Sequence, residues 1–458
     1  MNVCVIGGSG YVGLITGVGL AALGHSVVAV DKDVDRVARL QRGESPIYEE
    51  GVDLEALVGR MVTEGRLRYT TDLPKGIEHG EVIFIAVGTP EKSNGEADLS
   101  QVIDVAEELL RYIEGYKVIV VKSTVPVGTV ELVCSILQRS KVEGEDFDIV
   151  ANPEFLREGK GLFDFFSPTR IVVGTGSQRA AEVMRRLYAP FLTSCPAGEQ
   201  AGAAPNDGVV PRPRQDTPLV ETDVASAQMI KYASNAFLAT RISFINEIAS
   251  ICERVKADVV EVARGMGYDP RIGHEYLDAG LGFGGPCLEK DLKALLRIAR
   301  DNGYEAPVLN AVLDKNEYQV KHVIARLKEL TGYLLYRKIV AIFGLAFKPG
   351  TNDVRTSLSL RIIKLLAQEG AIVRAHDPVA IAEAREMQPD GVEYCEDPYE
   401  VVRHADALLL LTDWSQYRDL DYRAIKARMS MPNIIDTRNL LDKELLESAG
   451  FRWKGVGR

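Results

Sequence analysis

The first 31 residues carry the pattern that most constrains the fold of this chain. An apolar run at 3–6 leads into the glycine-rich motif Gly8-Ser9-Gly10-Tyr11-Val12-Gly13, a helical stretch to about Leu23, and a second apolar run at 26–30. Glycines at this spacing permit a tight turn, close approach of the backbone to a pyrophosphate, and close packing of helix on strand. The pattern predicts a parallel β-α-β unit that binds a dinucleotide at the N-terminus of its helix.

The second strand ends at Asp31, whose carboxylate can accept hydrogen bonds from both ribose hydroxyls and would repel a 2′-phosphate. We therefore expect NAD rather than NADP. One feature departs from the usual motif: Gly7 adds a residue between the strand and Gly8. We expect it to shift the loop slightly and to remove no required feature.

Later segments extend this organisation. Strand-like apolar runs, alternating with helical patterns such as 99–113, lie at 82–87, 118–121, 147–150 and 170–173. A helical block, 223–300 and 307–330, precedes a second alternating set: a strand at 338–343, a helix at 358–369, and strands at 371–376, 407–411 and 433–435. Alternation of this kind predicts an α/β fold with two Rossmann-like doubly wound sheets joined by a central helical spine.

The predicted domains are an N-terminal dinucleotide-binding domain (1–195), a flexible insertion (196–218), a central helical domain for dimerisation and catalysis (219–330) and a C-terminal Rossmann-like domain (331–458). The insertion is predicted from a Pro-, Gly- and Ala-rich stretch without apolar periodicity, and a loop without function is its simplest interpretation.

Composition narrows the classes of partner. The net charge is −11, and no segment gathers Lys and Arg into a basic face, which argues against nucleic acid. The apolar runs are too short to cross a membrane, and the N-terminus lacks the features of a signal peptide. The six cysteines are scattered without metal-type spacing. We expect a reduced, soluble, cytoplasmic protein without a metal.

Two turns follow predicted strands where ligands bind in open α/β sheets. They are Val87-Gly88-Thr89-Pro90 and Lys122-Ser123-Thr124-Val125-Pro126. Their small hydroxyl residues are placed to contact the ribose and nicotinamide of a cofactor. Taken alone, each turn also fits an ordinary connection between a strand and a helix, without a binding role.

The stretch Gly282-Phe283-Gly284-Gly285-Pro286-Cys287-Leu288-Glu289-Lys290-Asp291 is the most informative for chemistry. Pro286 is expected in the first turn of a helix that runs through Ala299. Cys287 would then lie at a helix N-terminus, where unpaired N–H groups and the positive charge of Lys290 favour a thiolate. Asp291 shares its helix face. The alternative is a buried structural cysteine.

Two further sets of residues suit the same chemistry. Lys231 and Asn235 lie four apart on a predicted helix, 225–238, and would aim a cation and an amide at one oxyanion. Glu154 and Glu158 follow the strand at 147–150, at the ligand edge of the sheet. Solvated surface residues are the alternative for both sets.

In combination these motifs resemble the UDP-glucose/GDP-mannose dehydrogenase family over nearly the whole chain. The resemblance is carried by GSGYVG (8–13), VGTP (87–90), KSTVPVGT (122–129), NPEFLREG (152–159), PTRIVVG (168–174), KYASNAFLATRISFINE (231–247), DPRIG (269–273), GLGFGGPCLEKD (280–291), GLAFKPGTNDVRTS (344–357) and DTRN (436–439).

The resemblance implies oxidation of C6 of UDP-glucose by two NAD, giving UDP-glucuronate for polysaccharide biosynthesis. Cys287 would attack the intermediate aldehyde to form a thiohemiacetal, and a second oxidation would give a thioester that is hydrolysed. Lys231 and Asn235 would stabilise the oxyanion, and Asp291 with Thr124 would hold a water for proton transfer. Glu154 would be the general base of hydrolysis, while Lys231 and Asp291 could exchange roles in proton transfer.

The resemblance also implies the binding residues and a homodimer or higher homo-oligomer. The expected cofactor contacts are Gly8, Gly10, Tyr11, Val12, Gly13, Asp31, Arg36, Thr89, Pro90, Ser123, Thr124, Glu158, Lys290 and Arg355. The expected substrate contacts are Glu154, Phe155, Leu156, Arg157, Lys231, Asn235, Arg271, Tyr276, Gly280, Phe283, Gly284, Phe347, Lys348 and Arg438.

Gln228 departs from the family pattern, which usually has Glu three residues before the lysine matched by Lys231. This change would alter the charge around that lysine. GDP-mannose and a UDP-N-acetylhexosamine are alternative substrates, although the DTRN motif favours UDP-glucose. A non-catalytic nucleotide-sensing scaffold is a further alternative, but it predicts the loss of at least one of the four residues Cys287, Lys231, Asn235 and Asp291, all of which are present.

Overall fold

The computed structural model describes residues 1–458 except 52, 93–94, 193–211 and 389. The chain divides into two compact units, Met1–Ala233 and Ser234–Arg458. Of the predicted insertion at 196–218, residues 196–211 lie outside the described residues. The four-part domain division expected from the sequence stays a prediction.

The first unit is built on an eight-stranded sheet with the order β3-β2-β1-β4-β5-β6-β7-β8. The strands are β1 (Asn2–Ile6), β2 (Ser26–Val30), β3 (Leu67–Thr70), β4 (Val82–Ile85), β5 (Lys117–Val121), β6 (Phe147–Ala151), β7 (Ile171–Gly174) and β8 (Leu219–Thr222). All neighbours are parallel except β6 and β7. The first six strands have the 3-2-1-4-5-6 order of dinucleotide-binding folds, whose ligands bind beyond the carboxyl ends of the strands.

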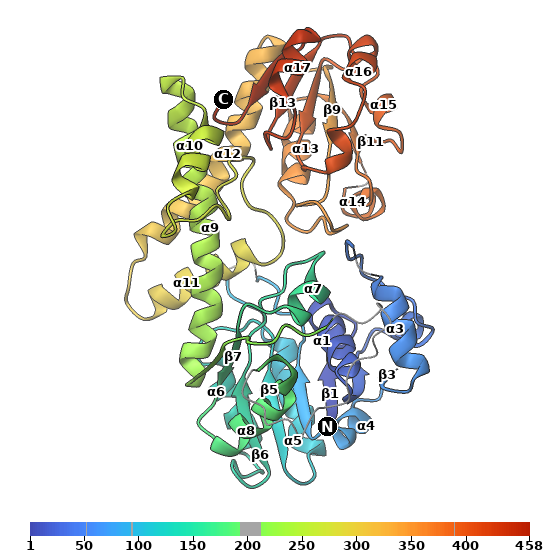
Figure 1. Ribbon diagram of the computed structural model, residues 1–458, viewed down its shortest axis with the longest axis vertical. Helices are drawn as coiled ribbons and strands as arrows, with labels where there is room; N and C mark the ends of the chain where they lie inside the picture. The colour runs from blue at the N-terminus through green and yellow to red at the C-terminus, as the bar shows by residue number, and fades with distance from the viewer. Residues whose placement is uncertain (52, 93–94, 193–211, 389) are drawn as a thin grey trace. The chain divides into compact units, whose positions relative to one another are not determined.

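Helices cover both faces of this sheet (Figure 1). They are α1 (Tyr11–Ala22), α2 (Val34–Gln41), α3 (Leu54–Thr63), α4 (Leu73–His79), α5 (Ser100–Tyr112), α6 (Thr129–Leu137), α7 (Gly161–Phe166), α8 (Gln178–Leu187) and the 3₁₀ turn η1 (Ala189–Phe191). Val3 and Val5 of β1 pack with Leu14 of α1, whereas Cys4 packs on the opposite face with Val102 of α5. Strands buried on both faces explain why these segments read as continuous apolar runs.

The second unit contains a six-stranded parallel sheet with the order β11-β10-β9-β12-β13-β14. Its strands are β9 (Ile339–Phe343), β10 (Ile372–His376), β11 (Val392–Tyr394), β12 (Ala407–Leu410), β13 (Asn433–Asp436) and β14 (Arg452–Gly455). Its helices are α13 (Leu358–Gln368), α14 (Ile381–Met387), α15 (Pro398–Val401), α16 (Tyr422–Arg428), α17 (Lys443–Ser448) and the 3₁₀ turn η2 (Ser415–Tyr417).

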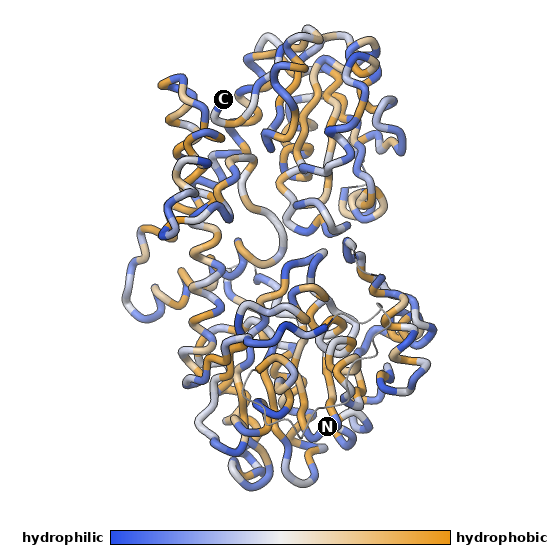
Figure 2. Tube along the Cα trace, viewed as in Figure 1, coloured by the Kyte–Doolittle hydropathy of each residue, from blue (hydrophilic) through white to orange (hydrophobic). Residues whose placement is uncertain are grey.

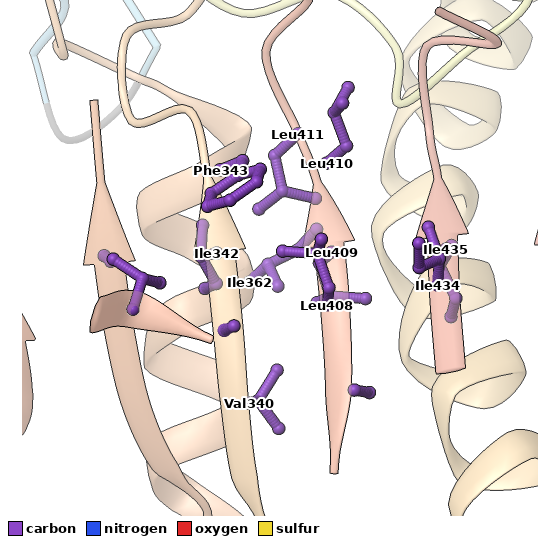
Figure 3. Packing of buried hydrophobic residues seen from close by; sticks show 14 of the residues in the cluster. Val340, Ile342, Phe343, Ile362, Leu408, Leu409, Leu410, Leu411, Ile434 and Ile435 are labelled. Atoms are coloured by element: carbon purple, nitrogen blue, oxygen red, sulfur yellow. The ribbon is translucent and has the colours of Figure 1, made fainter. Parts of the chain in front are cut away.

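The core of this sheet contains aliphatic and aromatic side chains from neighbouring strands. Phe343, Leu409 and Ile434 come from the three central strands, and Ile362 reaches them from α13 (Figure 3). The hydropathy colouring likewise places the most apolar residues along the strands (Figure 2). The strand order repeats 3-2-1-4-5-6, so the predicted α/β fold with two Rossmann-like sheets is confirmed.

Between the two sheets in sequence lie α9 (Val224–Val255), α10 (Val259–Gly267), α11 (Leu288–Asp301) and α12 (Pro307–Thr331). The boundary between the two units falls within α9. Residues 268–287 form no helix, although 223–300 was expected to be helical throughout. Gly282 and Gly285 adopt positive φ angles there, which interrupts a helix because only glycine occupies that region readily.

Sequence patterns also missed β3, β8, β11 and β14, which lie at or beside the ends of the two sheets. Strands there are partly solvated and carry charged residues such as Arg68, Glu221 and Glu393. Among the residues that the structure describes, no helix has the length and apolarity needed to cross a membrane. The same residues contain no cluster of three or more His, Cys, Asp or Glu side chains suited to a metal.

Candidate active site

The glycine-rich loop follows β1 and uses the additional Gly7 as its turning residue. Gly7 has a φ of +87°, and a Cβ atom there would lie 2.6 Å from the carbonyl oxygen of Ala86. The N–H groups of Gly7 and Gly8 donate to the carbonyl of Val30 at 2.9 and 3.0 Å. A Cβ on Gly13 would lie 2.1 Å from the Gly7 oxygen, so α1 begins directly against the loop. This cradle fits a dinucleotide pyrophosphate.

Asp31 lies beside the loop, immediately after β2. One of its carboxylate oxygens accepts from the Ser9 N–H at 3.0 Å and the other from the Asp33 N–H at 3.2 Å. These bonds fix the orientation of the carboxylate, and each oxygen keeps a lone pair for a ribose hydroxyl. Arg36, on α2, is exposed and pairs with Asp33.

Tyr11, the first residue of α1, joins the loop to the segment that follows β6. Its hydroxyl contacts Glu49, donates to the Arg157 carbonyl at 2.8 Å and accepts from the Gly161 N–H at 2.9 Å. Burial and the charge of Glu49 raise the pKa of Tyr11 well above its usual range. Glu49 also accepts from the Leu162 N–H at 3.0 Å. Sequence reasoning missed Glu49 because it belongs to no motif.

The two turns predicted to contact the cofactor, 87–90 and 122–126, are joined by hydrogen bonds. Thr89 Oγ1 donates to the Thr124 carbonyl at 2.9 Å, and Ser123 Oγ donates to the Val87 carbonyl at 2.7 Å. Thr124 is half-buried and lines a cavity of about 10 Å³ that Gln228 also lines. That volume is about the size of a single water molecule, and holding a water is the role that the family resemblance implies for Thr124. Val12 on α1 is partly buried and Pro90 is exposed.

Glu154 and Lys231 form a buried ion pair. Lys231 Nζ lies 2.9 Å from Glu154 Oε1, and the two side chains are only 6% and 8% exposed. The other carboxylate oxygen of Glu154 accepts from the Leu156 N–H at 2.6 Å. Burial alone would raise the pKa of Glu154, but the charges of Lys231 and Lys122 and the Leu156 N–H hold it below its usual range. The pair therefore provides a fixed carboxylate and a fixed ammonium group.

Neighbouring residues shape the surroundings of this pair. The ring of Phe155 faces the Arg170 guanidinium at 3.7 Å and Lys231 Nζ at 5.5 Å. Arg157 is exposed and makes a two-pronged ion pair with Asp164. Glu158 is partly buried and contributes negative charge near Tyr11.

Gln228 is buried one helical turn before Lys231. Its amide nitrogen donates to the Pro126 carbonyl at 3.0 Å, and its oxygen has no partner within the described protein. Because Gln228 carries no charge, it forms no ion pair with Lys231. The carboxylate that pairs with Lys231 is Glu154.

In the second unit Cys287 is the N-cap residue of α11 and is exposed to solvent. The Asp291 N–H donates to the Cys287 carbonyl at 2.9 Å as the first helical hydrogen bond. The sulfur therefore lies at the positive end of a helix, where a thiolate is stabilised. The helix begins slightly later than expected, because Pro286 precedes the cap rather than lying in the first turn.

Asp291 is 1% exposed and holds two partners in this unit. Asn235 Nδ2 donates to one carboxylate oxygen at 2.6 Å, and Lys290 Nζ lies 2.7 Å from the other. Asn235 comes from α9 and Lys290 from the first turn of α11. A buried, fully paired carboxylate of this kind orients the amide of Asn235.

Side-chain amides from two helices hold the glycine loop before Cys287. Asn246 Oδ1 accepts from the Gly280 N–H at 2.8 Å, and Gln319 Nε2 donates to the Gly280 carbonyl at 2.7 Å. Asn316 accepts from the Phe283 N–H at 2.8 Å and donates to its carbonyl at 2.9 Å. None was predicted. The sequence signal that could have identified them is an Asn or Gln on the apolar face of a predicted helix, because a buried amide there needs hydrogen-bond partners.

Residues of the C-terminal sheet approach the same loop. A Cβ on Gly284 would lie 3.3 Å from Cβ of Phe347, and one on Gly285 would lie 2.6 Å from its ring. Lys348 Nζ lies 5.9 Å from that ring. Arg438 lies beside Gly280 and donates to the Leu411 carbonyl at 2.8 Å. These contacts bring several predicted substrate residues together around one loop.

In the second unit, Arg271, Tyr276 and Arg355 are predicted ligand residues for which no contact with this loop is described above. Arg271 and Arg355 are exposed and pair with their sequence neighbours Asp269 and Asp353. Tyr276 is partly buried with a φ of +62°. Their binding roles stay predictions.

Comparison with known proteins adds independent findings. Residues 1–192 match the NAD binding domain of the UDP-glucose/GDP-mannose dehydrogenase family, residues 225–318 its central domain, and residues 341–443 its UDP binding domain. The UDP-glucose 6-dehydrogenase TuaD of Bacillus subtilis is 44% identical, over 98% of this chain and 92% of that protein. The UDP-glucose 6-dehydrogenase of Pseudomonas aeruginosa is 41% identical, over 100% of this chain and 98% of that protein.

A solved structure of a UDP-glucose dehydrogenase from Pyrobaculum islandicum superimposes with a TM-score of 0.88 at 38% identity. The match covers 100% of this chain and 98% of that one. The relatives are thus similar in sequence and in fold along the entire chain.

Proposed function

The chain belongs to the UDP-glucose/GDP-mannose dehydrogenase family, and from this premise we propose that it oxidises C6 of UDP-glucose to a carboxylate with two NAD. The observation that carries the proposal is the exposed Cys287 at the N-terminus of α11, whose first turn also carries Lys290 and Asp291. Asp291 in turn accepts a hydrogen bond from Asn235 on α9. A nucleophile poised in this way can retain the aldehyde between the two oxidations.

The glycine cradle and Asp31 would hold NAD through its pyrophosphate and ribose. When bound, NAD would supply the hydride acceptor at C6 in both oxidations, and the C6 hydroxyl proton released in the first would pass to water. Thr89, Ser123 and Thr124 border the carboxyl ends of β4 and β5, where the reactive end of a dinucleotide lies in such sheets. The cofactor is NAD, as the family assignment of this domain states.

Cys287 acts on the aldehyde left by the first oxidation. Its thiolate adds to C6, and the carbonyl oxygen becomes the oxyanion of a thiohemiacetal. The Asn235 amide, held by Asp291, and the Lys231 ammonium, held by Glu154, supply hydrogen bonds and positive charge to that oxyanion. Loss of a second hydride from C6 converts the thiohemiacetal to a thioester.

Hydrolysis completes the reaction. Glu154 accepts one proton from a water that adds to the thioester carbon, and the bond from carbon to Cys287 breaks to release the thiolate and a carboxylic acid. The acid then gives its proton to solvent and leaves as the carboxylate product. The lowered pKa of Glu154 keeps this base ionised at neutral pH. Arg438, Phe347 and Lys348 are proposed to contact the nucleotide part of the substrate.

The substrate is tested by a panel of sugar nucleotides with NAD in excess. We expect two NADH for each UDP-glucose consumed, and a much lower kcat/KM for GDP-mannose and UDP-N-acetylhexosamines. Turnover of one of those donors without turnover of UDP-glucose would assign the chain to another branch of the family.

We further propose a homodimer formed through α9. Phe237, Phe244 and Ile251 are exposed on this helix at intervals of seven residues, so they share one face. A contiguous exposed apolar stripe marks an interaction surface. Phe244→Glu should give monomers in sedimentation velocity, whereas Leu445→Glu, at an exposed site on α17, should leave the oligomer intact. Unchanged assembly of Phe244→Glu would place the interface elsewhere.

A cytoplasmic location is also proposed. Cys4, Cys134, Cys252 and Cys395 are free thiols, the state that a reducing compartment maintains.

A further inference from the structure

A second buried lysine lies beside the Glu154–Lys231 pair and has no role in the mechanism above. Lys122 directly follows β5 and is only 7% exposed. Its ammonium donates to the side-chain oxygen of Asn152 at 3.1 Å. Asn152 directly follows β6, and Val121 and Ala151 are register partners in the sheet. Lys122 and Asn152 are therefore the first residues after two neighbouring strands, and they lie side by side at the carboxyl edge of the sheet.

Hydrogen bonds fix both polar atoms of the Asn152 side chain. Its amide nitrogen donates to the Val172 carbonyl at 2.7 Å, and its oxygen also accepts from the Tyr188 hydroxyl at 2.7 Å. Glu154 lies two residues further along the chain. The bond from Lys122 to Asn152 thus fixes the start of the segment that carries the Glu154 carboxylate.

The charged and titratable groups that face Lys122 come from three other elements. Glu154 follows β6, Lys231 lies on α9 and Tyr188 follows α8; the ring of Phe84, on β4, lies 6.0 Å from the ammonium. The pKa of Lys122 is lowered to about 8: burial lowers it most, the negative charge of Glu154 partly opposes this, and the positive charge of Lys231 adds to it.

Two buried lysines therefore share one buried carboxylate. Gln228, another buried polar side chain near Lys231, is neutral and adds no negative charge. When Lys122, Lys231 and Glu154 are all ionised, the cluster carries one excess positive charge, which favours the ionised form of Glu154.

We propose that Lys122 is a positioning residue for Glu154: it anchors the Glu154 segment through Asn152 and keeps the Glu154 carboxylate ionised through its charge. This inference rests on the proposed function, in which Glu154 is the base that hydrolyses the thioester. Lys122 itself touches neither cofactor nor substrate in the account above.

The sign of the expected pH effect follows from the charges. Glu154 works as a carboxylate, and its pKa is lowered by the positive charges around it. Removing the charge of Lys122 raises that pKa, so a higher pH is needed to ionise Glu154. The acid limb of the kcat profile then moves to higher pH. A shift of about one unit is typical when one nearby buried charge is removed.

The experiment measures NADH formation against pH, from about 3.5 to about 9, for the wild type, Lys122→Met and Lys122→Arg. Lys117→Met is the matched control, because Lys117 is a buried lysine at the opposite end of β5 whose ammonium donates to the Glu78 carbonyl. We expect Lys122→Met to shift the acid limb upward, which lowers kcat about tenfold on that limb and little at neutral pH, with little change in the KM for NAD. Lys122→Arg should restore the wild-type limb, and Lys117→Met should leave it unchanged.

Intact-protein mass spectrometry gives a second readout. At low pH Lys122→Met should accumulate the sugar thioester on Cys287, because hydrolysis has become the slow step. A loss of kcat that is equal at every pH, with no adduct, would overturn the proposal and leave Lys122 a structural residue. Should Lys122→Met fail to fold, Lys122→Gln carries the same test, since it removes the charge and can still bond to Asn152.

Glu154→Gln separates this proposal from the proposed function. If Glu154→Gln hydrolyses the thioester at the wild-type rate, the assignment of Glu154 as the base is wrong. If Glu154→Gln stalls as the thioester while Lys122→Met keeps the wild-type pH profile, the function stands and the role of Lys122 is wrong.

Discussion

Cys287→Ser should lose the formation of acid almost completely while retaining NAD binding. We expect kcat to fall by about a thousandfold or more, because a serine hydroxyl at this position is a far weaker nucleophile than a thiolate at a helix N-terminus. The cradle proposed to hold NAD belongs to the other compact unit, so the substitution should leave it unchanged. The rate of NADH formation tests the expected loss of kcat, and the dissociation constant for NAD tests the retained binding.

The matched control for this substitution is Cys395→Ser, since Cys395 is a partly exposed cysteine of the same unit that lies in no motif. Its kcat should match that of the wild type. If Cys287→Ser retained two NADH per UDP-glucose at a comparable rate, the reaction would proceed without covalent capture by sulfur.

Lys231→Met should reduce both activity and stability. The substitution removes the ammonium proposed to face the oxyanion, which typically costs a hundredfold to about a thousandfold in kcat. It also leaves Glu154 buried without the cation 2.9 Å away. Breaking a buried ion pair by removing one partner costs about 3 kcal/mol or more in the free energy of unfolding.

Denaturant unfolding of three variants isolates the role of this pair. Lys231→Met combined with Glu154→Gln should recover much of the lost stability, because the buried charge is removed together with its partner. Lys293→Met is the control: Lys293 pairs with Glu289 on α11, and both side chains are partly exposed, so its loss should change stability by less than about 1 kcal/mol. Equal destabilisation by Lys231→Met and Lys293→Met would contradict the account of a buried pair.

Features that depend on local sequence could be predicted well. The glycine loop, the acid at the end of β2 and the cysteine at a helix N-terminus each follow from a few consecutive residues whose spacing dictates their geometry. The 3-2-1-4-5-6 order of both sheets likewise follows the usual arrangement of alternating strands and helices.

Features that depend on distant partners could not be predicted. Glu49 meets Tyr11 across 38 positions, and Asn316 meets Phe283 across 33. Each belongs to a segment whose local pattern reports only its secondary structure. Lys122 stands within a recognised motif, but its burial and its bond to Asn152 appear only when β5 and β6 are paired.

The central claim is that Cys287 carries the substrate between the two oxidations. The most direct test is intact-protein and peptide mass spectrometry of Glu154→Gln after mixing with UDP-glucose and NAD, because the hydrolysis of the thioester is expected to be slowest in that variant. The account predicts a UDP-sugar acyl group on the Cys287 peptide. NADH formation with Cys287 unmodified throughout turnover would contradict it.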